Sequence, residues 1–200
     1  MRPEFPVEYD IDANDRFARV NTGWSVEART SCDERLSDDR VLGQSLWDLV
    51  QDRTSREIYE RLLQRVRENR VKVDFAFRCD TAVERRLLRM RIEGGEQRSV
   101  HFQVRLLQQQ LREPLELLRI GRPTSNRSIP VCSWCKRSPI PAGYWVEVEE
   151  ALQTLGLFDS DPLPSLDHVI CPECRKVITE SLLNEDRPPT PVILGSMPAA

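Results

Sequence analysis

Two Cys-x-x-Cys pairs near the C-terminal end constrain this chain more tightly than any other feature. The first pair is Cys132 and Cys135, and the second is Cys171 and Cys174. Two tight turns that each present two thiolates form a tetrahedral sulfur site, the coordination that structural Zn²⁺ prefers. The four cysteines therefore predict a metal ion that stabilises the C-terminal quarter of the chain.

The spacing of the pairs predicts a folded element between them. They are separated by 35 residues, whereas a compact zinc ribbon leaves about 15 to 20. Trp145, Val148, Leu152 and Leu155 recur at spacings of three, four and three, which predicts a helix ending near Gly156. The helix would pack on the metal-binding turns, and the ion would replace a core that about 50 residues cannot build alone.

The ligand set and the metal leave two alternatives open. His168 stands three residues before Cys171. Four cysteines complete a zinc site, so we expect His168 to act as a hydrogen-bond donor to a ligand, with direct ligation as the alternative. Four cysteines also hold iron–sulfur clusters, so zinc is the preferred interpretation and iron the second. Four cations are expected to offset the charge of the site: Lys136, Arg137, Arg175 and Lys176.

Thiol chemistry is a competing interpretation of the same residues, because Cys-Pro-x-Cys can be an exchanging dithiol. Such dithiols use a single motif at a helix N-terminus in a βαβ scaffold. Two pairs without that scaffold favour metal binding. A switch in which the four cysteines release zinc on oxidation stays open as the alternative function.

Length and composition fit one domain of about 100 residues and a smaller one. The chain has 200 residues, of which 40% are hydrophobic and 30% charged. The longest charge-free stretch is the 13 residues Pro188–Ala200, and a spanning helix needs about 20 apolar residues. The first dozen residues lack the apolar stretch of a secretory signal. We therefore expect no membrane partner and a reducing cytoplasm, where paired cysteines hold metal.

The charge balance disfavours nucleic acid as a partner. The net charge is -3, with 29 basic residues among 32 acidic ones, so no long-range positive field would attract a phosphate backbone. The local exception is 84–91, where basic and apolar residues alternate. This pattern predicts a strand with one solvated, arginine-bearing face.

The first hundred residues predict a five-stranded antiparallel sheet with helices on one face. Residues 9–21 alternate around the turn-forming cluster 13–15, which predicts a hairpin. Thr54 and Glu57 form a capping box, and apolar residues follow it at helical spacing. The other predicted elements are a short helix near 23–28, a turn and short helix in 41–50, a helix over 55–69, and strands over 71–79, 85–93 and 99–107.

Residues 5–112 resemble a PAS domain, the small sensory α/β fold of bacterial signalling proteins. The resemblance rests on Asp-Arg-Phe-Ala-Arg-Val-Asn at 15–21, Val-Leu-Gly-Gln-Ser-Leu-Trp-Asp at 41–48 and Phe-Arg-Cys-Asp at 77–80. It implies a small-molecule site between helices and sheet, with the ligand unknown, and a homodimer.

No cofactor is assigned to this domain. It lacks the Asn-Cys-Arg-Phe-Leu-Gln element of flavin photosensors. Its one histidine, His101, is interpreted as a strand residue hydrogen-bonded to a neighbour rather than as a haem ligand. Cys32 and Cys79 have no partner at metal-ligand spacing and are interpreted as small buried hydrophobes.

A helix is expected over 112–120, with Leu111, Leu115 and Leu118 on one side, and 121–126 breaks it. The predicted domains are then a PAS-like domain at 5–112, a linker at 113–130, a four-cysteine metal-binding module at 131–184 and a disordered tail at 185–200.

The cysteine module also resembles a known cassette, one found at the C-terminus of bacterial PAS and response-regulator proteins. The matching strings are Cys-Ser-Trp-Cys-Lys-Arg at 132–137, Tyr-Trp-Val-Glu-Val-Glu-Glu at 144–150 and His-Val-Ile-Cys-Pro-Glu-Cys at 168–174. The cassette usually has glycine after the histidine, where this chain has Val169. Together the two resemblances imply a non-enzymatic sensor or adaptor of bacterial signalling that acts through a signalling partner, a homodimer or both.

Overall fold

The computed structural model describes residues 7–31, 36–50, 52–69, 71–119, 121–157 and 161–183. Their backbone contacts divide the chain into two compact units. Among the described residues, the first unit takes 7–75 and 89–106, and the second takes 76–88 and 107–183. Cys32 and the predicted disordered tail lie outside the described residues.

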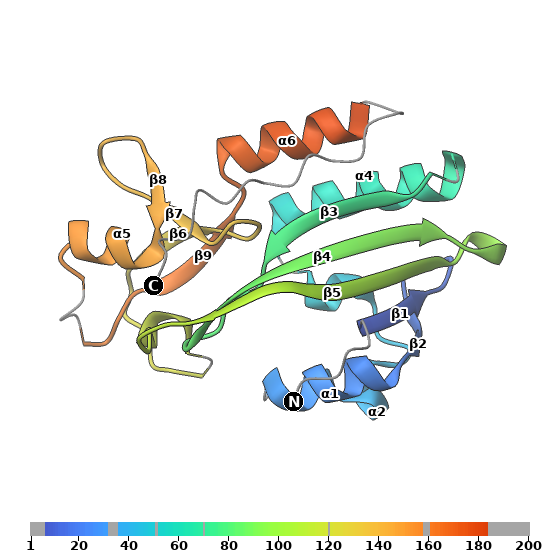
Figure 1. The fold of residues 1–200 in the computed structure, drawn as a ribbon, viewed down its shortest axis with the longest axis horizontal. Helices are drawn as coiled ribbons and strands as arrows, with labels where there is room; N and C mark the ends of the chain where they lie inside the picture. The colour runs from blue at the N-terminus through green and yellow to red at the C-terminus, as the bar shows by residue number, and fades with distance from the viewer. Residues whose placement is uncertain are drawn as a thin grey trace. The chain divides into compact units, whose positions relative to one another are not determined.

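An antiparallel five-stranded sheet forms the first part of the fold, as predicted, with the strand order β2-β1-β5-β4-β3 (Figure 1). β5, the last of these strands in the sequence, pairs with β1, the first. The centre of the sheet therefore depends on contacts between residues distant in sequence. The strands are β1 (Val7–Ile11), β2 (Phe17–Val20), β3 (Val73–Arg78), β4 (Glu84–Gly94) and β5 (Val100–Leu111). The helices are α1 (Thr22–Ser31), α2 (Asp38–Val41), α3 (Leu46–Leu49) and α4 (Arg53–Asn69).

The hairpin between β1 and β2 is confirmed. Its turn is held by the side chain of Asp12, whose Oδ1 accepts hydrogen bonds from the backbone amides of Asn14 and Arg16. Asp15 has a φ of 60°, in the left-handed region that aspartate tolerates. The polar turn cluster found in the sequence therefore reverses the chain as expected.

Helix α4 is confirmed, but its predicted cap is wrong. The helix begins at Arg53, so Thr54 lies inside it. The carboxylate of Asp52 accepts from the backbone amide of Ser55 at 2.7 Å, and this acceptor satisfies one of the free amides of the first turn. The apolar stripe is buried as predicted at Ile58, Leu62 and Val66.

Close backbone approach holds α4 against β4 within the first unit. A Cβ added to Gly94 would lie 2.7 Å from the carbonyl oxygen of Val66, so only glycine fits at this crossing. Arg67 pairs with Asp15 at 2.8 Å and donates to the carbonyl of Arg98. These bonds connect the helix to the β1–β2 turn and to the β4–β5 turn.

The second unit has its own apolar core. Its elements are β6 (Ser128–Cys132), β7 (Arg137–Pro139), β8 (Trp145–Glu147), α5 (Val148–Thr154), β9 (Ser165–Val169) and α6 (Pro172–Leu183), after a short 3-10 turn at Glu116–Leu118. The buried residues of this core are Leu115, Leu117, Ile129, Val131, Val148, Leu152 and Leu157. Residues of the predicted linker thus supply part of the core, while the domain limits themselves stay a prediction.

Two predicted helices need correction. β5 continues to Leu111 and a 3-10 turn follows, so 112–119 is not an α-helix. The amides of Arg112 and Leu115 donate to the carbonyls of Val83 and Ala82 instead, and Leu115 and Leu117 pack into the core. The helix before Gly156 is present as α5, but Trp145 lies in strand β8. Gly156, with a φ of 62°, lies just beyond the end of α5 as expected.

Neither α4 nor any other helix in the described part of the chain has the length and hydrophobicity that crossing a bilayer requires.

Three strands meet in one polar cluster in the first unit. Asp10 of β1 is in register with Arg19 of β2 and with His101 of β5, and its carboxylate accepts from both side chains, at 2.6 Å from the Nδ1 of His101. This confirms the interpretation of His101 as a strand histidine bonded to a neighbour. Burial alone would raise the pKa of Asp10, but the hydrogen bonds from Arg19 and His101 outweigh burial and lower it.

We expect Asp10→Asn to lower the free energy of unfolding at pH 7 by no more than about 1 kcal/mol, because the partners are partly exposed. A lowered pKa contributes stability above the unfolded value, and this contribution is lost as the pH falls through the folded value. The difference between wild type and variant should therefore shrink below about pH 4. Urea unfolding from pH 7 to pH 3 measures it, with Asp39→Asn on the exposed face of α2 as the control. A difference that grows in acid would contradict this assignment.

Candidate metal centre

The first cysteine pair lies in a tight turn at the end of β6. Cys132 is the last residue of the strand, and its carbonyl accepts from the amide of Lys136 at 2.9 Å. Lys136 takes a φ of 60°, which turns the chain back into β7. The turn directs both sulfur atoms of the pair to the same side.

The second pair is positioned by the start of α6. Pro172 is the first residue of that helix, where a missing amide costs nothing and a fixed φ favours helix formation. Cys171 directly precedes the helix and Cys174 lies in its first turn. The amide of Cys174 donates to the sulfur of Cys171 at 3.4 Å.

Parallel pairing of β6 with β9 brings the two pairs together. Cys132 is in register with Val169, so the chain that leaves β9 reaches Cys171 beside the first turn. The amide of Cys171 donates to the sulfur of Cys132 at 3.4 Å, and the amide of Ser133 donates to the carbonyl of Val169. Val169 is an ordinary strand residue in this arrangement, and valine suits that position.

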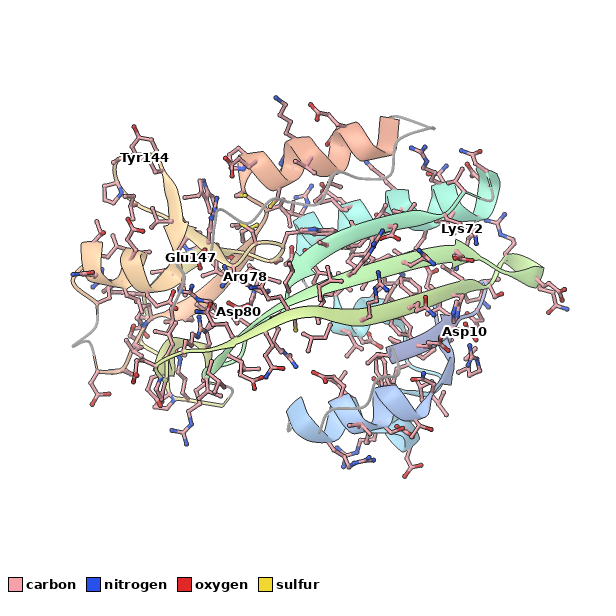
Figure 2. The ribbon with its side chains drawn as sticks, in the orientation of Figure 1. Asp10, Lys72, Arg78, Asp80, Tyr144 and Glu147 are labelled. Carbon is pink, nitrogen blue, oxygen red and sulfur yellow. The ribbon has the colours of Figure 1, made fainter. Side chains whose placement is uncertain are left out.

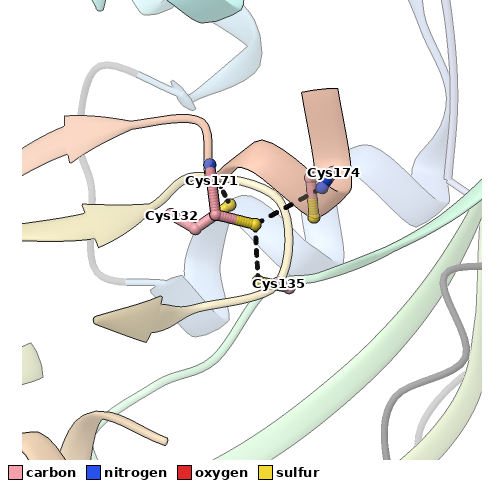
Figure 3. Close-up of side chains that lie close together, drawn as sticks. All are labelled: Cys132, Cys135, Cys171 and Cys174. Atoms are coloured by element: carbon pink, nitrogen blue, oxygen red, sulfur yellow. Dashed lines mark hydrogen bonds between the residues drawn. The ribbon is translucent and has the colours of Figure 1, made fainter. Parts of the chain in front are cut away.

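The four sulfur atoms all lie within 4.8 Å of one another, and all four side chains are buried. Figure 3 shows them turned toward a common point from the turn after β6 and the start of α6. The sulfurs of Cys135 and Cys171 are 3.8 Å apart, which is too far for a disulfide. A tetrahedral ion with metal–sulfur bonds of about 2.3 Å has sulfur–sulfur edges of about 3.8 Å. The four cysteines can therefore hold a metal ion.

The electrostatics of the cluster also favour a cation. Hydrogen bonds from the other three thiols lower the pKa of Cys132, so one thiolate forms readily. Hydrogen bonds to the neighbouring sulfurs, with burial, raise the pKa of Cys174 and of Cys135. Four thiolates in one buried site therefore need a positive ion to offset their charge.

Three of the four cations predicted to surround the site have partners of their own. Lys136 donates from its Nζ to the carbonyl of Ser133 at 2.9 Å. Arg137 lies 3.3 Å from a carboxylate oxygen of Glu173, and Lys176 lies 4.0 Å from Glu180. Their proposed role in offsetting the charge of the sulfur site stays a prediction.

The turn that carries the first pair is fixed to residues of β3 that belong to the same unit. The indole of Trp134 donates to the carbonyl of Ala76 at 3.2 Å, and the amide of Arg78 donates to the carbonyl of Trp134 at 2.8 Å. Trp134 is buried. The metal-binding turn is thus bonded at both its backbone and its central side chain.

Arg78, the last residue of β3, is buried in the second unit. Its side chain is 5% exposed, donates twice to the carboxylate of Glu147, at 2.9 and 2.7 Å, and pairs with the fully buried Asp80 (Figure 2). Burial alone would lower the pKa of Arg78, but Asp80 and Glu147 raise it above its ordinary value. The guanidinium therefore stays charged inside the unit.

Arg85 and Arg112 extend the same network through one carboxylate. Both donate to Oε1 of Glu149, at 3.0 and 2.9 Å. Burial alone would raise the pKa of Glu149, but the amide at the start of α5 and the two arginines lower it. Arg86 is also buried and donates to the carbonyl of Cys79. The predicted solvated arginine face of 84–91 is therefore wrong for Arg85 and Arg86. It is confirmed for Arg89 and Arg91, which pair with Asp74.

This ion network, which connects the β3–β4 region to α5 within the second unit, was not predicted from the sequence. The only signal was the acidic string at 147–150. The arginines gave none, since the alternation of basic and apolar residues on a strand is the same whether its polar face contacts water or carboxylates.

The remaining candidate residues lie apart from the sulfur cluster. His168 lies on β9, in register with Val131, and is not among the groups that gather around the four sulfurs in the described chain. Its supporting role stays a prediction. Cys79 lies 3.4 Å from the guanidinium of Arg86 and has no cysteine partner among the described residues.

No protein-family model matches the sequence, and the search of curated proteins returned no match. Among solved structures, the chain is similar to the photoactive yellow protein domain of the sensor histidine kinase Ppr from Rhodospirillum centenum, with 20% identity and a TM-score of 0.39 over 50% of this chain and 84% of that one. It is also similar to the PAS domain of an HTR-like protein from Haloarcula marismortui, with 18% identity and a TM-score of 0.34 over 53% of this chain and 84% of that one.

We expect Arg78→Met to lower the free energy of unfolding by about 3 kcal/mol, because it leaves the buried carboxylate of Asp80 short of a partner. Arg91→Met is the control. Its side chain is 46% exposed and pairs with Asp74, so a loss of at most about 1 kcal/mol is expected. Urea unfolding followed by tryptophan fluorescence measures both. Equal losses in the two variants would show that the buried network adds nothing to stability.

Proposed function

We propose that this chain is a non-enzymatic sensor or adaptor of bacterial cytoplasmic signalling. A PAS-like sheet domain receives the signal, and a module held by a structural zinc ion docks a signalling partner. The observation that carries the proposal is the group of four buried sulfurs within 4.8 Å of one another.

The closed character of the sulfur site supports a structural ion. Catalytic zinc keeps an open position for water or substrate, whereas structural zinc has four protein ligands. All four cysteines are buried, with exposures of 0 to 2%, so a metal-bound thiolate here is a poor nucleophile for an external substrate. Zinc is preferred to iron because two separated Cys-x-x-Cys turns suit a tetrahedral d¹⁰ ion.

The sensory part of the proposal rests on the order of the motifs at 15–21, 41–48 and 77–80 and on the five-stranded antiparallel sheet. In PAS domains such a sheet often accompanies a ligand site and a homodimer interface. The signal itself would be a small molecule or a partner, and the output would come from the docked protein.

Purified protein is expected to contain one zinc ion per chain, measured by native mass spectrometry, which also reports any PAS ligand and the oligomeric state. Cys135→Ser removes one thiolate and should abolish tight zinc binding. At free zinc about 1,000 times the dissociation constant, the wild type gains about 4 kcal/mol from the ion, and the variant should lose this gain.

Cys79→Ser is the matched control, since Cys79 lies outside the sulfur cluster, and it should keep its zinc. Iron in place of zinc would overturn the metal assignment. A wild type without bound metal would overturn the structural role of the site.

The thiol switch is the second candidate, favoured by the distance of 3.8 Å between the sulfurs of Cys135 and Cys171. Sulfurs this close can form a disulfide once the ion leaves. The burial of all four sulfurs argues for slow access by oxidants. We therefore expect peroxide to leave the zinc bound, as a chromogenic chelator would measure. Reversible zinc release with disulfide formation would instead establish the switch.

A further inference from the structure

A pocket of about 340 Å³ opens beside the sulfur cluster, entirely within the second unit. Its walls come from β6, from β9 and from the chain between Leu117 and Thr124. The residues that line it include Leu117, Arg119, Arg122, Val131, Lys136 and Leu166. None of the four cysteines lines it, so this pocket is separate from the candidate metal centre.

The floor of the pocket is apolar. Leu117 and Val131 are buried members of the second unit's core, and Leu166 packs against the same core. Leu117 and Val131 are each 1% exposed, so the apolar surface that a ligand would remove from water belongs mainly to the partly exposed Leu118 and Leu166.

The charge of the pocket is positive. Asp80 also lines it, but that carboxylate is already paired with Arg78 and lies 3.6 Å from Arg112. Arg119 lies 3.4 Å from Glu116 at the rim, which offsets its charge. Arg122 donates only to backbone carbonyls, those of Leu117, Pro123, Leu163 and Pro164.

Lys136 and Arg122 thus supply the positive charge. Among the described residues, neither side chain forms a hydrogen bond or an ion pair with a carboxylate. Nζ of Lys136 uses one of its three N–H groups on the carbonyl of Ser133, which leaves two for a ligand. Arg122 is committed to carbonyls, so Lys136 is the cation available to hydrogen-bond an anion directly.

The pocket borders the residues that carry the sulfur ligands. Val131 directly precedes Cys132, and Lys136 directly follows Cys135. A ligand in the pocket would therefore contact the strand before the first metal-binding turn and the residue after it. Ligand binding would therefore change the surroundings of that turn, although the ligand makes no bond to the ion.

We propose that this pocket binds a small organic carboxylate with an apolar body. The apolar part lies against Leu117, Val131 and Leu166, and the carboxylate accepts hydrogen bonds from Nζ of Lys136. This site is distinct from any PAS ligand site and does not depend on the function proposed above.

The test uses the full chain as purified and two probes of equal shape, 2-naphthoate and neutral 2-naphthamide. Naphthoate is expected to bind with a dissociation constant of about 1 mM or below. Amide shifts in two-dimensional NMR should localise it to Val131 and Leu166. Lys136→Met should weaken naphthoate about fivefold or more and leave naphthamide unchanged, because it removes a charge-assisted hydrogen bond but keeps the aliphatic bulk.

Lys176→Met is the matched control. It also removes a lysine charge close to a cysteine of the cluster, Cys174, but Lys176 does not line the pocket. It should leave naphthoate affinity unchanged. Leu166→Phe, which reduces the pocket volume, should weaken both probes even if Lys136→Met fails to fold. Equal affinity for the two probes, equal effects of the two lysine variants, or shifts away from the pocket would overturn the proposal.

Discussion

The parallel pairing of β6 with β9 is the constraint on which the second unit depends. It sets Cys132 level with Val169, so the first residues after β9 begin α6 beside the turn after β6. Four thiolates then share one buried site. Without a cation their mutual repulsion and burial would oppose this arrangement, so an ion bound at the four sulfurs would stabilise the strand pairing, and the pairing would favour the ion.

The ion network of the second unit has a different physical role. Arg78, Arg85 and Arg112 are paired with carboxylates inside the unit, where desolvation offsets much of the attraction between the charges. Such a network contributes little net stability compared with apolar packing of equal volume. It does penalise any arrangement that leaves one charge without its partner, and it therefore fixes how the β3–β4 region packs with α5 in that unit.

The apolar core and the pocket explain how a small unit with a metal site can also present a binding surface. Leu117 and Val131 belong to the core and line the pocket at the same time. An ion at the four cysteines would hold the two turns, so the core would not need to close fully around them. The strands that carry the cysteines can then leave one apolar edge open next to the cation of Lys136.

The sequence by itself determined the parts that depend on local pattern. Two Cys-x-x-Cys turns, the β1–β2 hairpin, the apolar stripe of α4 and the five strands all follow from spacing and turn chemistry, because these signals lie within a few residues of one another. It could not determine that Asp52 rather than Thr54 caps α4, since both side chains are good cap acceptors and they lie two residues apart.

Tertiary structure alone decided which polar residues are buried. Arg78 and Asp80 have the sequence pattern of surface residues, and only partners about 30 or 70 positions away, Arg112 and Glu147, make their burial possible. The pocket beside Lys136 likewise arises from segments far apart in sequence. Charge pairing and cavities depend on where distant segments meet, and a local pattern carries no information about that meeting.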